Sequence, residues 1–73
     1  MNEKREIYAD FNNADVQGRL RLSCAGTLED LRDKELELVE GLELTLSDGE
    51  LAADGVATRS DDEAIWVATL DWR

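Results

Sequence analysis

The sequence predicts a small all-β domain: a partly closed barrel of about five antiparallel strands, with one short connector helix near residues 27–34. Three observations favour this fold class. Apolar and polar residues alternate with a period of two along much of the chain, as in half-buried strands. Turn residues such as Asp48-Gly49 separate these runs. The chain has 73 residues, 42% of them hydrophobic, so we assign residues 1–73 to one domain with a single core.

The first two alternating runs predict a β-hairpin. One run covers residues 5–11 and the other covers residues 18–24. Between them, the sequence NNAD contains Asn and Asp, which readily adopt turn conformations. The residues expected to face the core are Ile7, Ala9, Phe11, Leu20, Leu22 and Cys24.

The alternation stops before residues 27–34, which predict a connector helix of about two turns. Thr27 is suited to the N-cap position, ahead of acidic residues in the first turn. Leu28 and Leu31 are three positions apart and would share the helix face that packs on the sheet. A helix this short depends on tertiary packing for its stability.

Leucines alternate again between residues 36 and 46, and this pattern predicts two short strands. Glu40 falls on the inward parity, where a lone buried carboxylate would be costly. We therefore expect Glu40 and Gly41 to form a bend between the two strands. Asp48-Gly49 follows and predicts a hairpin with a two-residue loop, which would place Leu46 opposite Leu51.

The same hairpin register sets Glu43 directly opposite Asp54. Like charges in this arrangement are unfavourable. A β-bulge at Asp54-Gly55 would separate them. Such a bulge would also turn Val56 and Thr58 inward in place of Ala57.

The last ten residues predict a final strand that carries both tryptophans on one face. Small residues separate Trp66 from Trp72, so the two indoles could fill much of a barrel interior. We expect Trp66 to lie in the core. For Trp72, near the terminus, two interpretations stay open: packing against the barrel end, or an exposed contact for a partner.

The chain resembles small bacterial proteins with an SH3-like β-barrel over about two-thirds of its length. The resemblance lies in the runs GRLRLSCAGTLEDL, GLELTLSDGEL and DGVATRSDDEAIWVATLDW. The common features are a Gly-Thr-Leu connector, an Asp-Gly hairpin and a terminal strand with two tryptophans. These features belong to the scaffold, so the resemblance implies an SH3-like fold and implies no activity.

The net charge of −10 is concentrated in residues 37–73, which carry ten acidic and two basic side chains. This charge argues against nucleic acid and anionic membranes as partners, since both carry the same sign. The sequence has no apolar run of signal-peptide or membrane-spanning length. With only one cysteine, Cys24, the chain cannot form an internal disulfide, and we expect a cytoplasmic protein.

The residues that most often carry enzyme chemistry are missing or unsupported. The chain has no histidine, and without one Cys24 has no partner to activate its thiol. The acidic turns lack the spacing of a calcium loop. We therefore expect no enzymatic activity, no cofactor and no metal. Arg19 and Arg21 are expected to pair across strands with Glu37 or Glu43, and an anion site is the alternative.

These observations favour a small acidic protein-interaction module that binds a basic protein surface. A nucleic-acid-mimicking inhibitor of a DNA- or RNA-binding protein is the alternative, and a homodimer through a strand edge is compatible with either. The candidate partner-binding residues are Asp54, Asp61, Asp62, Glu63 and Trp72.

Overall fold

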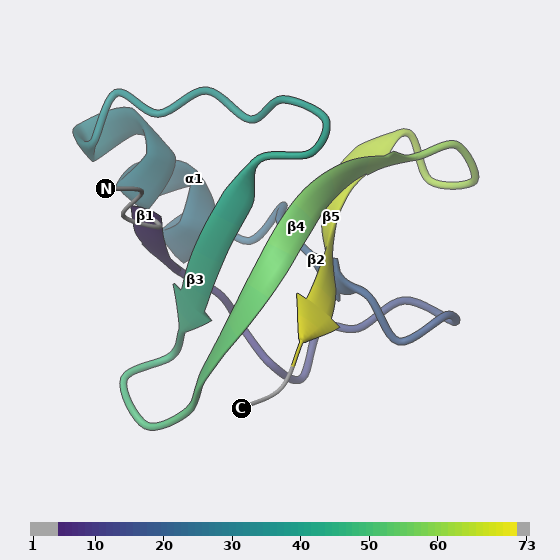
Figure 1. Cartoon of the computed structure of the whole chain (residues 1–73), viewed down its shortest axis with the longest axis horizontal. Helices are drawn as coiled ribbons and strands as arrows, with labels where there is room; N and C mark the ends of the chain where they lie inside the picture. The colour runs from purple at the N-terminus through teal and green to yellow at the C-terminus, as the bar shows by residue number, and fades with distance from the viewer. Residues whose placement is uncertain (1–4, 72–73) are drawn as a thin grey trace.

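The computed structural model describes residues 5–71, which form a five-stranded sheet and one helix (Figure 1). The sheet order is β1-β3-β4-β5-β2. The predicted β-rich fold with five strands and one short helix is confirmed. The elements are β1 (Arg5–Tyr8), β2 (Leu20–Arg21), α1 (Ala25–Asp33), β3 (Glu43–Ser47), β4 (Ala52–Ser60) and β5 (Ile65–Asp71).

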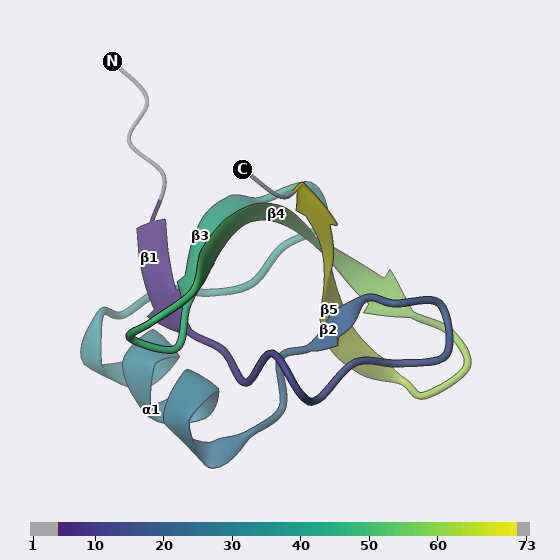
Figure 2. The same ribbon diagram turned by 90° about the horizontal axis from the view of Figure 1, so that it is seen from below.

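Two parts of the predicted architecture are wrong: the sheet is mixed, and within residues 5–71 it is not closed into a barrel. It bends into an open arc with β1 and β2 at its two ends (Figure 2). β1 runs parallel to β3, whereas the other neighbours are antiparallel. The connection between β1 and β3 includes β2 and α1, so it is long enough to bring the chain back in the same direction.

The predicted hairpin between the first two runs is also wrong, because β2 pairs with β5. The turn lies later, within a small loop around Asp15. The Asp15 amide donates to the Arg19 carbonyl at 2.8 Å, and the Arg21 amide donates to the Asn13 carbonyl at 2.9 Å. The Asp15 carboxylate accepts from the amides of Gln17 and Arg19 at 2.9 and 2.8 Å. This carboxylate stabilises a turn that begins at Asp15, the last residue of the NNAD sequence in which a turn was predicted.

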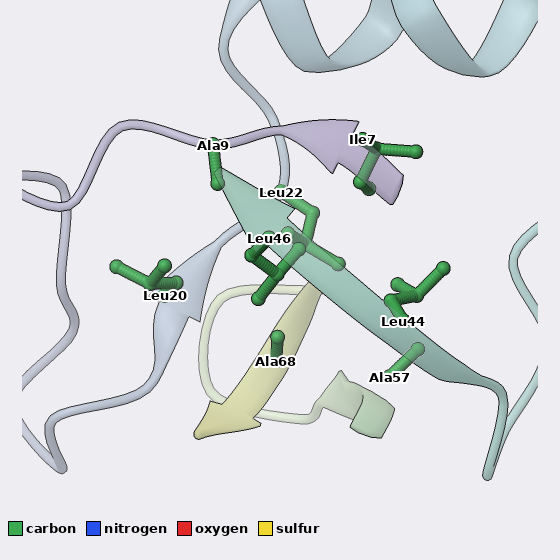
Figure 3. Packing of buried hydrophobic residues seen from close by; sticks show 8 residues of the cluster. All are labelled: Ile7, Ala9, Leu20, Leu22, Leu44, Leu46, Ala57 and Ala68. Atoms are coloured by element: carbon green, nitrogen blue, oxygen red, sulfur yellow. The ribbon is translucent and has the colours of Figure 1, made fainter. Parts of the chain in front are cut away.

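The core faces the inside of the arc, and the alternation predicted most of its members correctly (Figure 3). Trp66 and Leu70 pack against this core but remain partly exposed. The leucines therefore fill the space expected for the indoles, and Trp72 lies outside the described residues. The buried cluster consists of Ile7, Ala9, Leu20, Leu22, Leu44, Leu46, Ala57 and Ala68.

The β3–β4 hairpin has a four-residue loop, since Ser47 lies opposite Ala52. The Asp48 carboxylate accepts from the amides of Glu50 and Leu51, both at 2.8 Å, and this bonding extends the loop beyond two residues. The new register places Leu46 opposite Ala53.

This register also removes the need for the predicted bulge. Glu43 lies opposite Val56 rather than Asp54, so the two carboxylates do not oppose each other. The β3–β4 ladder is continuous, Val56 is exposed and Ala57 is buried. The predicted bulge and the inward Val56 are therefore both wrong.

Helix α1 lies along the outer edge of β1 (Figure 1), and side chains of the helix form hydrogen bonds with the backbone of β1. The Thr27 hydroxyl donates to the Tyr8 carbonyl at 2.7 Å, and the Asp30 carboxylate accepts from the Tyr8 amide at 2.8 Å. The Lys34 ammonium donates to the Glu6 carbonyl. These side chains share one helix face because they are three and four positions apart. Thr27 is thus buried in the helix interface, and Cys24 occupies the N-cap instead.

The predicted bend at Glu40 and Gly41 is confirmed, although residues 36–39 before it form no strand. Gly41 has a φ of +85°, a conformation that favours glycine. The Glu40 carboxylate accepts from the Thr58 hydroxyl at 2.6 Å and from the Arg59 amide at 3.1 Å. These hydrogen bonds hold the pKa of Glu40 below its usual value, and the hydrogen bond from Thr58 has the largest effect. The bend is therefore fastened to β4.

Candidate functional site: an apolar groove beside an acidic turn

A groove with a volume of about 510 Å³ lies between α1, residues 36–38 and the adjoining ends of β4 and β5. This volume is within the range of sites that bind small ligands or a few side chains of a partner. Glu37 and Arg59 are the charged residues in its lining. The larger apolar residues that line it include Leu22, Leu28, Leu31, Leu36, Leu38 and Trp66.

The first wall of the groove is built by α1 and its C-terminal turn. The Leu36 amide donates to the Leu31 carbonyl at 2.9 Å, and the Glu35 amide donates to the Arg32 carbonyl at 3.1 Å. With Glu35 at a φ of +52°, this pattern is a Schellman motif, which brings the residue after the turn onto the last helical turn. Leu31 and Leu36 are therefore neighbours in one wall. Leu28 extends this wall and is 52% exposed.

The opposite wall is formed by a cross-strand pair. Arg59 on β4 lies opposite Trp66 on β5, and its guanidinium carbon is 5.7 Å from the centre of the indole ring. This distance is within the range of a cation–π interaction. Arg59 Nη2 also donates to the Ala64 carbonyl at 2.9 Å. These contacts hold the arginine against the strand, so that one face of Trp66 is covered by its guanidinium.

The β4–β5 turn, residues 61–64, adjoins this wall and is acidic. The Ala64 amide donates to the Ser60 carbonyl at 2.8 Å, and Ala64 has a φ of +57°. Asp61 and Asp62 are exposed, and neither forms an ion pair with any residue between 5 and 71. The turn therefore carries two exposed carboxylates shortly before Ala64, which lines the groove.

Glu63 has a structural role in the same turn. Its carboxylate accepts from Arg21 Nε and Nη2, both at 2.8 Å, in a bidentate pair that ties the turn to β2. The Arg21 hydrogen bonds lower the pKa of Glu63, and the Glu63 carboxylate raises the pKa of Arg21. The expected pairing of Arg21 with Glu37 or Glu43 is therefore wrong. Arg19 pairs with Asp15 instead, at 2.8 Å.

Replacing Glu63 with glutamine should lower stability most at neutral pH. Because the folded-state pKa of Glu63 is depressed, its contribution is present above the unfolded-state pKa, about 4.3, and is lost as the pH falls through the folded value. Urea midpoints of the wild type and Glu63→Gln should therefore converge in acid. Glu50→Gln, which removes an exposed hairpin carboxylate, is the control. A difference that stays constant from neutral pH to about pH 3 would contradict the assigned pair.

The structure does not gather all the predicted partner-binding residues in one place. Asp61, Asp62 and Glu63 share the β4–β5 turn, but Asp54 lies on β4, seven positions before Asp61 and more than about 20 Å from it along an extended strand. Asp54 lies opposite Asp71 and accepts a hydrogen bond from the Thr45 hydroxyl at 3.3 Å. Trp72 lies outside the described residues. The candidate set therefore reduces to the turn.

Sequence reasoning did not identify the groove. The spacing of Leu28 and Leu31 does indicate a shared apolar helix face, but it predicts that this face is buried on the sheet and not that it lines a groove. Leu36 and Leu38 are predicted to lie in a strand, whereas in the structure they line the groove. The Schellman motif before them has Glu35 in the position where glycine is usual, so the sequence gives no signal of it. Trp66 was expected in the core, whereas it packs against the core with one side and lines the groove with another.

Between residues 5 and 71, no three or more His, Cys, Asp or Glu residues are grouped as metal ligands would be. The same part of the chain contains no helix with the length and apolarity needed to cross a membrane. The groove lining offers apolar contact area, one guanidinium and one carboxylate, and the adjoining turn adds Asp61 and Asp62; these groups suit binding. Comparisons with protein-family models, curated proteins and solved structures found no match to this chain.

Proposed function

We propose that this chain is a non-enzymatic interaction module that binds a basic protein through the groove and the acidic turn beside it. The single observation that carries the proposal is the combination of a half-exposed leucine in an apolar groove with two exposed carboxylates, Asp61 and Asp62, in the turn that reaches the groove at Ala64. Apolar contacts at the centre and charged residues at the rim are the common arrangement of protein interfaces.

Charge supports the choice of partner. The net charge of −10 attracts a basic surface over distances of about a Debye length, roughly 10 Å at 0.1 M salt. Asp61 and Asp62 then supply local complementarity, which mainly increases the association rate and selects the partner. Glu37, which lines the groove, adds a third carboxylate.

The proposal predicts that the position of the carboxylates matters, as well as their number. Asp61→Asn with Asp62→Asn should weaken binding of a peptide rich in leucine and lysine by about threefold to tenfold at low salt. Glu43→Gln with Glu50→Gln removes the same charge from exposed positions on β3 and in the β3–β4 loop, away from the β4–β5 turn, and should have a smaller effect. Titration calorimetry at increasing salt would measure both. Equal effects of the two double variants would contradict the proposal.

The nucleic-acid mimic is less well supported. Mimicry needs carboxylates spaced along one surface as phosphates are, and Asp54 is remote from Asp61 and Asp62. It also makes no use of an apolar groove. Competition between this protein and duplex DNA for a basic DNA-binding protein would favour the mimic, particularly if Leu28→Glu left the competition unchanged.

A further inference from the structure

The two edge strands of the sheet are already occupied on their outer sides. On β1, the Tyr8 amide and carbonyl bond to Asp30 and Thr27 of α1, and the Glu6 carbonyl bonds to Lys34. On β2, the outer side bonds to the preceding loop, through the Arg21 amide and the Asn13 carbonyl at 2.9 Å. A partner that added a strand to either edge would first have to displace these groups.

The groove, in contrast, presents side chains. Its apolar lining comes from α1 with residues 36–38 and from the adjoining ends of β4 and β5. Leu28, 52% exposed, and Trp66 lie among the lining residues. A groove lined by apolar side chains is the kind of surface that accepts the apolar face of an amphipathic helix.

We infer that the groove binds a short amphipathic helix of a partner, with an apolar stripe flanked by lysine or arginine. This inference rests on the proposed function and adds the conformation of the bound segment. The stripe would contact the leucines and Trp66, and the flanking cations would lie near Glu37, Asp61 and Asp62. These contacts pair apolar with apolar or negative with positive groups, which is the complementarity expected of such an interface. The one cation in the groove lining, Arg59, is already engaged with the Trp66 ring and the Ala64 carbonyl.

Two peptides of identical leucine and lysine content separate the helix from a strand. In one, the leucines recur at positions i, i+3, i+4 and i+7; in the other, leucine and lysine alternate strictly. The protein carries Trp72→Phe, so that Trp66 is its only tryptophan and reports directly on the groove. The helical pattern should bind at least about tenfold more tightly, shift the Trp66 emission and gain helical circular dichroism on binding.

Leu28 and Leu51 provide a matched pair of variants, since each is 52% exposed. Leu28→Glu should weaken the helical peptide by at least about tenfold, because it places a carboxylate among the apolar contacts. Glutamate is a good helix former and suits an early helical turn, so α1 should be retained. Leu51→Glu, in the β3–β4 loop, should change the affinity within about twofold. Backbone amide spectra verify the fold of both variants.

The outcomes separate this inference from the proposed function. Equal affinity for the two peptides, or no loss of affinity in Leu28→Glu, would overturn the helix-binding inference. If the Asp61→Asn, Asp62→Asn variant still weakened binding in that case, the proposed acidic module would stand. If neither peptide bound, or if neither the leucine nor the aspartate variants changed binding, both proposals would be overturned.

Discussion

Replacing Leu46 with alanine is expected to destabilise the domain by about 2–5 kcal/mol, the usual range for a fully buried leucine. Leu46 has no exposed surface and lies at the centre of the core cluster. The residues nearest to it on β4 are small: Ala53 lies directly opposite, and a Cβ atom on Gly55 would be 3.1 Å from Leu46 Cδ1. Such neighbours cannot move in to fill the cavity, so we expect the upper part of the range.

A loss of this size is a large fraction of the roughly 5–15 kcal/mol by which a typical domain is stable, and the free energy of unfolding of a small domain is at the lower end of this range. Urea denaturation followed by circular dichroism would measure it. Leu51→Ala, at a half-exposed loop position, is the control and should cost less than about 1 kcal/mol. A cost below about 1 kcal/mol for Leu46→Ala would show that the cluster is not packed as described.

Replacing Thr27 with valine should destabilise the domain by about 1–3 kcal/mol, the cost of leaving a buried carbonyl without its donor. The Thr27 side chain is fully buried, and its hydroxyl donates to the Tyr8 carbonyl. The Cys24 sulfur lies 3.0 Å from the same hydroxyl oxygen, so two groups lose a partner. Valine has nearly the same shape, which limits the change to the hydrogen bonds.

This variant should also expose the β1 edge, since Thr27 helps to fasten α1 to it. We expect faster amide exchange at Tyr8 and self-association at increasing protein concentration, measured by exchange NMR and sedimentation. Thr27→Ser keeps the hydroxyl and should recover most of the stability, whereas Thr69→Val changes an exposed threonine and should be neutral. Unchanged Tyr8 exchange in Thr27→Val would show that α1 is held by other contacts.

The alternation of apolar residues was sufficient to predict most of the buried side chains. Ile7, Leu20, Leu44 and Ala68 all face the core as expected, because the side-chain period of a strand is a local property of the backbone. The bend at Glu40 was predicted from the free-energy cost of burying a lone carboxylate, which is also a local property. In both cases, the physical cause lies within a few residues of its effect.

The β3–β4 hairpin was predicted apart from its register, whereas the partners of β1 and β2, which are distant in sequence, could not be predicted in this way. The pairing of β1 with β3 depends on a helix that bonds to the outer edge of β1, and nothing near Ile7 in the sequence indicates it. The hairpin register shifted because one carboxylate, that of Asp48, bonds to two loop amides. The groove was missed for a similar reason, because Glu35 adopts a conformation that usually requires glycine.

The parallel pairing of β1 with β3 has a consequence for synthesis of the chain. Within residues 5–71, β1 has β3 as its only neighbour in the sheet order, and the pairing register extends from Leu44 to Ser47. On the ribosome, the N-terminal strand therefore has no sheet partner until residue 47 has been translated and has left the exit tunnel. The segment between Tyr8 and Ser47 must therefore emerge before β1 can complete its place in the sheet.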